Sequence, residues 1–216
     1  KRTRFGFREW EIRGTAFYLN GVRQQLRADL AFGGVSPDQK EEAVEFWRKS
    51  GQNMFRLRFQ STWGGLRQNR ALDFFDEHGV VVRKTITTFD GQHASYALAV
   101  QEERDGKSVR VANKALFDNV RAQARARTRD MRNHPSIFEW ELDNEIVYIN
   151  ARNRGQLKEV EPEFKKMAED VHRVDPTRPG INVAGGRALL DQSLPVNGGH
   201  YETANMREYP DMAYGL

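Results

Sequence analysis

Hydrophobic and polar residues alternate along several short segments of the chain, which is the pattern of strands with one buried face. The alternation is clearest at 53–59 (NMFRLRF) and 136–142 (SIFEWEL), and a largely apolar run at 80–86 (VVVRKTI) indicates a third strand. Shorter strands are predicted at 180–186 (GINVAGG) and 195–202 (PVNGGHYE). These segments supply the strands of a sheet.

Between these strands, apolar residues recur at helical spacing. The predicted helices lie at 36–51, 70–79, about 111–132, and 157–174. Ser36 is placed to cap the first helix, Pro37 fits its first turn, and Gly51 ends it. Pro162 must lie in the first turn of the last helix or break it, because proline lacks the N–H that a helix interior needs.

Near the start of the chain, residues 15–30 predict a hairpin with Asn20-Gly21 at its turn, followed by a strand that ends near Leu30. From there strands and helices alternate, which indicates a parallel sheet with helical crossovers. An open doubly wound sheet and a barrel both fit that alternation. No glycine-rich phosphate fingerprint follows the first strand, and polar residues gather where strands end, as in barrel enzymes. The predicted fold is therefore α/β, an apparently incomplete (β/α)8 TIM barrel with strands one to six.

The segment 134–146 (HPSIFEWELDNEI) combines a buried strand with many carboxylates. Period-two alternation puts two sets of residues on opposite faces: Glu139, Glu141, Asp143 and Glu145 against Phe138, Trp140, Leu142 and Asn144. In a barrel the acidic face points inward, where bare carboxylates are costly. We expect Arg56 and Arg58 to lie across the barrel and neutralise Glu139 and Glu141. Asp143 and Glu145, at the mouth, are the carboxylates placed for chemistry.

Composition narrows the possible classes of protein. The 216 residues include no cysteine, which excludes disulfides and thiolate sites, and no apolar run approaches the roughly 18 residues that a bilayer requires. The net charge is +4, and arginines cluster at 121–132 (RAQARARTRDMR). That cluster fits either a phosphate-binding helix or a solvated helix face, and we favour the second and predict no nucleic-acid partner. The compartment is not determined, although a secreted or periplasmic location is favoured over a cytoplasmic one.

Four motifs in order resemble glycoside hydrolase family 2, the family of β-galactosidases, β-glucuronidases and β-mannosidases. They are FYLNG followed by LR, NHPSI, WELDNE and DPTRP, and the similarity extends from residue 6 to residue 201. The resemblance implies a retaining β-glycosidase that uses double displacement, with two carboxyl groups about 5 Å apart. It implies a carbohydrate substrate and no cofactor.

The resemblance also assigns roles to individual residues. Glu145 is similar to the general acid/base, Asn144 to the residue that hydrogen-bonds the sugar 2-hydroxyl, and Arg56 to the arginine that supports the nucleophile. Tyr201, which follows His200, resembles the tyrosine beside that nucleophile. In the family a small residue often precedes Asn-Glu, whereas this chain has Asp143, which could raise the pKa of the acid.

The family takes its nucleophile from strand seven, which is expected beyond residue 216. Glu202 is a poor substitute, because it lies one strand too early and faces away from Tyr201. We expect residues 1–16 to lead in from a preceding β-sandwich domain and 17–216 to form the partial barrel. Two other functions stay open: a non-catalytic carbohydrate-binding or scaffold fragment, and a basic nucleic-acid-binding protein.

Several further polar residues have two interpretations. Asp90 and His93 lie in the loop after the third strand, where they could contact sugar or simply form a turn. Trp63 could stack on a sugar ring or pack within its own loop. His134 precedes a strand, far from the mouth, and is interpreted as structural. The spacing of histidines and carboxylates predicts no catalytic metal.

Overall fold

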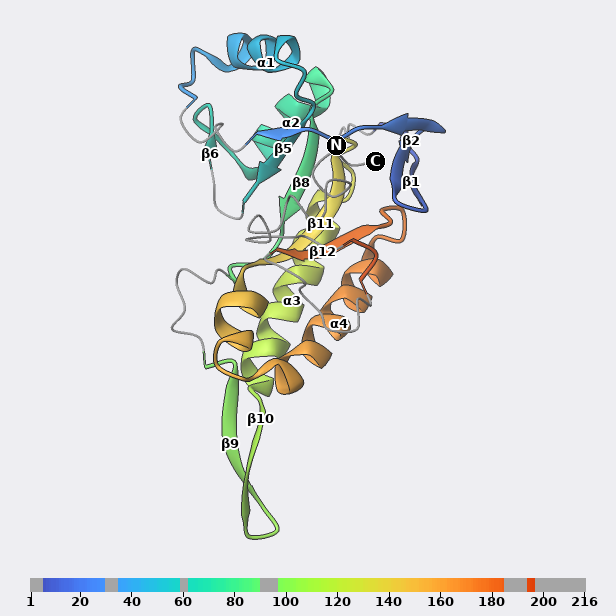
Figure 1. The fold of residues 1–216 in the computed structure, drawn as a ribbon. Coiled ribbons are helices and arrows are strands. Elements are labelled where there is room, and N and C mark those ends of the chain that lie inside the picture. Colours follow the sequence, from blue (N-terminus) through green and yellow to red (C-terminus); the bar gives the residue numbers. More distant parts are fainter. Residues whose placement is uncertain (1–5, 30–34, 59–61, 90–96, 185–193, 197–216) are drawn as a thin grey trace, which may run out of the picture.

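The centre of the molecule is a five-stranded parallel sheet with the order β12-β11-β8-β5-β4 (Figure 1). The computed structural model describes residues 6–29, 35–58, 62–89, 97–184 and 194–196. The strands of this sheet are β4 (Ala28–Asp29), β5 (Met54–Leu57), β8 (Val81–Thr85), β11 (Ile137–Asn144) and β12 (Gly180–Ala184). Each strand pairs with the preceding strand of the series, so the order never reverses as it does in a doubly wound sheet. The prediction of an incomplete barrel is thereby supported.

A helix follows most of these strands and leads to the next. The helices are α1 (Lys40–Lys49), α2 (Gln68–His78), α3 (Lys114–Met131) and α4 (Leu157–Val174), with the π-helix η3 (Ile146–Arg152) directly after β11. Two short strands, β6 (Thr62–Trp63) and β7 (Leu66–Arg67), pair before α2. Helices α3 and α4 lie side by side (Figure 1), and Asp170 of α4 pairs with Arg121 and Arg125 of α3 at 2.8 and 2.7 Å. Part of the basic cluster is therefore neutralised within the fold.

A small antiparallel sheet precedes the barrel strands. It consists of β1 (Trp10–Arg13), β2 (Ala16–Leu19) and β3 (Val22–Gln24). Asn20 and Gly21 have φ of 51° and 77°, as the predicted two-residue turn requires. Trp10 and Phe17 place their rings 5.4 and 5.6 Å from that of Phe138, so this sheet packs on β11. It spans both sides of residue 16, and the predicted domain division remains a prediction.

Sequence analysis missed the hairpin formed by β9 (Ala99–Arg104) and β10 (Lys107–Ala112). It projects from the body of the molecule beside the start of α3 (Figure 1). Its turn is Asp105-Gly106, with φ of 51° and 70°. The helix predicted from about residue 111 was therefore placed too early, because residues 111–112 belong to β10.

Three expectations about the helices were wrong. Helix α1 begins at Lys40, so Pro37 precedes its first turn, and the Ser36 hydroxyl instead donates to Asp38 or Gln39 before the helix. Pro162 lies beyond the first turn of α4 without breaking it, so that helix tolerates one missing backbone hydrogen bond. By contrast, Gly51 and Gly79 follow α1 and α2 with positive φ, as predicted.

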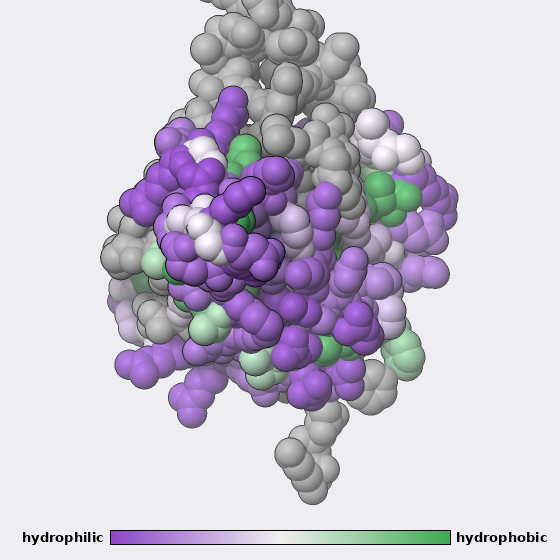
Figure 2. Space-filling view, turned by 90° about the horizontal axis from the view of Figure 1, so that it is seen from below, coloured by the Kyte–Doolittle hydropathy of each residue, from purple (hydrophilic) through white to green (hydrophobic). Residues whose placement is uncertain are grey.

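The apolar faces of the strands pack against the helices. Leu57, Val82 and Trp140 are fully buried from the sheet, and Phe117 and Phe164 are fully buried from α3 and α4. Seen from below, the described residues present a mostly hydrophilic surface with scattered hydrophobic side chains (Figure 2). Among them, no helix has the length and apolarity needed to cross a membrane.

Candidate active site

The parallel register aligns charged residues across the inner face of the sheet. Arg56 of β5 is opposite Arg83 of β8, and Arg83 is opposite Glu139 of β11. One row further along the strands, Thr85 is opposite Glu141. Residues in register on adjacent strands project to the same face, so cations and carboxylates from three strands meet there.

Glu141 is the centre of this cluster. Its buried carboxylate accepts from Arg56 Nε and lies 2.8 Å from Nη2 of Arg83, on the other side. The Thr85 hydroxyl donates to it as well. The expected neutralisation by Arg56 is therefore present. The second guanidinium comes from Arg83, however, and not from Arg58 as the sequence had suggested.

Glu139 lies one row deeper and is paired less completely. One of its carboxyl oxygens is buried without a hydrogen-bond partner. Burial raises the pKa of Glu139 to about 8, although Arg83 and Arg56 oppose the shift, while Glu141 reinforces it. The protonated form therefore prevails at neutral pH, which is how a carboxyl group avoids the cost of an unpaired buried charge.

A β-bulge changes the alternation at the end of β11. The pairing with β12 runs from Glu141 opposite Asn182 to Asn144 opposite Ala184, three steps against two. Because of this extra residue, Asn144 joins Glu141 on the inner face, where its Oδ1 accepts from Arg56 at 2.7 Å. Strict alternation, which put Asn144 on the apolar face, was therefore wrong at this point.

Asp143 is buried and forms a local cap, not an open position at the mouth. Its Oδ2 accepts from the backbone N–H groups of Ile146 and Val147, at 2.8 and 3.3 Å. Between these groups lies Glu145, which is only 4% exposed and has a φ of 62°. That left-handed conformation is rare for glutamate and occurs here at the residue predicted to be the acid/base.

Lys84 is a buried cation that sequence analysis did not consider. Its ammonium donates to the carbonyl groups of Leu57, Arg58 and Thr85 at 3.0 to 3.3 Å. Burial lowers the pKa of Lys84 to about 7; Glu141 opposes the shift and Arg127 adds to it. The side chain links the ends of β5 and β8, beside the strands that carry Arg56 and Arg83.

Of the other predicted site residues, only Trp63 lies in the part of the chain that the structure describes, and it does not join this cluster. Trp63 is 1% exposed, and its ring lies 5.1 and 4.8 Å from those of Phe74 and Phe75, so packing accounts for it. The remaining four predicted positions lie outside the described residues: Asp90, His93, His200 and Tyr201.

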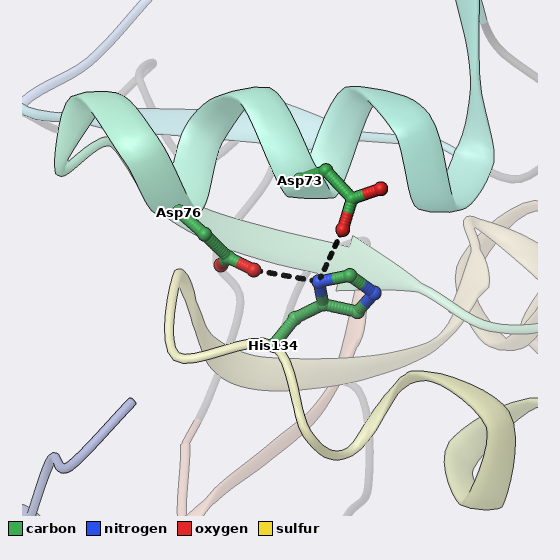
Figure 3. Close-up of side chains that lie close together, drawn as sticks. All are labelled: Asp73, Asp76 and His134. Carbon is green, nitrogen blue, oxygen red and sulfur yellow. Dashed lines mark hydrogen bonds and ion pairs between the residues drawn. The ribbon is translucent and has the colours of Figure 1, made fainter. Parts of the chain in front are cut away.

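One group of side chains in the described ranges is close enough to hold a cation. His134 Nδ1 is 2.7 Å from Asp76 and 3.9 Å from Asp73 (Figure 3). Asp76 also accepts from the N–H of Ser136 at 2.9 Å and attracts the buried guanidinium of Arg178. Ser136 therefore already occupies Asp76 Oδ1, and the positive charge of Arg178 would repel a metal ion. We therefore interpret the group as a clamp between α2 and the loop before β11, in agreement with the structural role predicted for His134.

Arg83 could have been identified from the sequence. It lies in the predicted strand 80–86, where alternation puts Arg83 on the face opposite Val82 and Lys84. Because Arg83 and Lys84 are both cations, the sequence alone does not say which of the two faces points inward. The bulge in β11 has no comparable signal, because it arises from pairing with β12, more than thirty residues away in sequence.

Comparisons with known proteins agree with this geometry. Residues 9–211 match the family model for the TIM barrel domain of glycosyl hydrolases family 2. A β-glucuronidase of Bacteroides uniformis aligns with a TM-score of 0.64 and 17% identity over 98% of this chain and 26% of its own. A β-glucuronidase of Parabacteroides merdae aligns with a TM-score of 0.59 and 21% identity, covering 84% of this chain and 21% of its own.

A β-D-mannosidase of Dictyoglomus thermophilum aligns with a TM-score of 0.53 and 18% identity over 82% of this chain and 22% of its own. At these identities the solved structures establish the fold. The chain spans between about a fifth and a third of the length of such relatives. A comparison with curated protein sequences gave no match. Because the family model matches nearly the whole chain, the chain belongs to glycoside hydrolase family 2 and forms part of its TIM barrel domain.

Proposed function

We propose that this chain is the acid/base-bearing part of the catalytic barrel of a retaining β-glycosidase. The observation that carries the proposal is the geometry at the end of β11. Arg56 binds both Glu141 and Asn144 there, and Glu145 is the first residue after the strand. The acid is thus attached to a rigid, buried strand end, on the side of a barrel where substrates bind.

In the proposed reaction, a carboxylate nucleophile attacks the anomeric carbon while Glu145 donates its proton to the departing glycosidic oxygen. The ionised Glu145 then takes a proton from water, whose oxygen attacks the same carbon and releases the nucleophile. Asn144 is proposed to hydrogen-bond the sugar 2-hydroxyl, and Arg56 to orient Asn144. The nucleophile is proposed to lie on a strand beyond residue 216.

The substrate class is a terminal β-linked sugar. Solved structures of similar fold include β-glucuronidases, a β-galacturonidase and a β-mannosidase, so their sugars are the first to test. β-Galactosides belong to the same panel, because the family that the sequence resembles includes β-galactosidases. Tyr201, His200, Asp90 and His93 stay proposed sugar contacts.

The test is Glu145→Gln in the full-length protein, assayed on aryl β-glycosides of each sugar. Dinitrophenol leaves without protonation, whereas methoxyphenol needs an acid. We expect kcat/KM to fall at least about 100-fold on methoxyphenyl glycosides and less than about 10-fold on dinitrophenyl glycosides.

The matched control is Glu163→Gln on α4, where the carboxylate pairs only with Lys166 at 2.6 Å among the contacts described. It should leave both rates unchanged. A Glu145→Gln variant with wild-type kcat/KM on methoxyphenyl glycosides would refute the assignment of the acid. Sugar binding without turnover by the wild-type protein would favour the carbohydrate-binding alternative.

A further inference from the structure

The backbone around Glu145 is fixed on both sides by named contacts. Before it, the Asn144 N–H donates to the Phe89 carbonyl at 2.8 Å. After it, the N–H groups of Ile146 and Val147 donate to the Asp143 carboxylate. Glu145 therefore lies in a short connection that is closed by a side chain located two residues earlier.

The cap also explains the unusual conformation of Glu145. The first N–H groups of a helix have no partners within that helix, and those of η3 are buried with Ile146 and Val147. Asp143 satisfies two of them only if the chain turns sharply between β11 and η3. Glu145 makes that turn with its positive φ, and a glutamate there is strained unless its neighbours hold it.

We propose that Asp143 is a positioning residue, which holds Glu145 at the angle required for proton donation by accepting the N–H groups of residues 146 and 147. The inference rests on the proposed role of Glu145 and adds a residue to it. It assigns to Asp143 the part of a hydrogen-bond acceptor. It differs from the expectation drawn from the sequence, in which the charge of Asp143 tunes the acid.

Three variants of the full-length protein test the proposal. Asp143→Asn keeps an acceptor oxygen and loses the charge, whereas Asp143→Ala and Asp143→Gly lose the acceptor. Asparagine caps helices about as well as aspartate. Asp170→Ala is the matched control, since it removes a buried carboxylate from the interface of α3 and α4.

The readout is the ratio of kcat/KM on dinitrophenyl to that on methoxyphenyl glycosides, which a general loss of folded protein does not change. We expect the ratio to rise about 10-fold or more in Asp143→Ala and Asp143→Gly, as the acid loses its alignment. It should stay within about 3-fold of wild type in Asp143→Asn and in Asp170→Ala. The alkaline limb of the pH profile should not move in Asp143→Asn.

Two results would overturn the proposal. An unchanged ratio in whichever truncation folds would mean that Glu145 needs no cap. A shifted alkaline limb in Asp143→Asn would mean that the charge, not the acceptor, is what matters. Glu145→Gln separates these failures from a failure of the proposed function. If Glu145→Gln keeps its activity on methoxyphenyl glycosides, the acid itself is misassigned, whatever the Asp143 variants do.

Discussion

Glu139 is buried, and one of its carboxyl oxygens has no hydrogen-bond partner. The register puts it between Arg83 and Gly180, and a Cβ at position 180 would lie 3.0 Å from the Glu139 Cγ. Glycine is therefore the residue that leaves room for this side chain. The arrangement is costly for a carboxylate and less so for a carboxylic acid, so the protonation of Glu139 links the stability of the fold to pH.

We predict that the free energy of unfolding falls as pH rises from about 4.5 to about 8. In this pH range the carboxyl group of Glu139 keeps its proton in the native state but has released it in the unfolded state. The stabilising contribution of Glu139 is therefore complete below pH 4.5 and is lost as the pH rises through the native pKa of about 8. The limiting slope is about 1.4 kcal/mol per pH unit. Glu139→Gln should remove this decline, measured by urea unfolding at a series of pH values.

The contribution of Lys84 to the free energy of unfolding changes with pH in the opposite direction. Its native pKa of about 7 lies below the ordinary value of 10.5, so its contribution rises between those two pH values. It is the same in the wild type and in Glu139→Gln, and therefore cancels in their difference. Glu163→Gln on α4, where the carboxylate pairs with Lys166, should keep the wild-type slope. Parallel pH profiles for the wild type and Glu139→Gln would contradict the prediction.

At the scale of elements, period-two patterns located β5 and β11, because each has one face against helices and one toward charged side chains, and a largely apolar run located β8. The pattern could not locate the bulge at the end of β11, which depends on its neighbour β12. It also passed over the β9–β10 hairpin, although Asp105-Gly106 is a strong turn signal, because the apolar residues near 111 were assigned to the following helix.

The hairpin turn gives a prediction confined to one element. Gly106 has a φ of 70° and an added Cβ would meet no atom within 4 Å, so only the backbone conformation opposes substitution. Gly106→Val should destabilise the hairpin by about 1–2 kcal/mol, because a branched residue rarely adopts this φ. Hydrogen exchange should accelerate in residues 99–112 and stay unchanged in β11.

Gly106→Asn is the control, since asparagine tolerates the left-handed region and should preserve slow exchange in the hairpin. Faster exchange throughout the sheet in Gly106→Val would show that the hairpin supports the barrel, contrary to its position outside the body of the molecule (Figure 1).

At the scale of the whole molecule, the end of the sheet opposite the candidate site is held by one fully buried arginine. Arg178 donates to the carbonyl groups of Arg132 and His134, which lie between α3 and β11, and of Ile137, the first residue of β11. It also pairs with Asp175 and lies over the Trp140 ring at 4.9 Å. Burial lowers the pKa of Arg178 to about 10, so the guanidinium stays charged at neutral pH. Helix α3, strand β11 and the connection from α4 to β12 therefore meet at this side chain.

Arg178→Met should lower the free energy of unfolding by about 3–5 kcal/mol, because it removes the cation paired with the buried Asp175 carboxylate and leaves several carbonyl groups without the guanidinium donor. Trp140 donates to the same Asp175 at 2.9 Å, so the transition can be followed by tryptophan fluorescence during urea unfolding. Arg173→Met is the control: its side chain is 72% exposed and pairs with Asp170, and its loss should cost less than about 1 kcal/mol. Equal decreases in the free energy of unfolding of the two variants would mean that the buried Arg178 contributes no more to stability than an exposed ion pair. A large loss in Arg178→Met alone would show that the contacts of this one buried side chain hold α3, β11 and the connection from α4 to β12 together at the end of the sheet opposite Glu145.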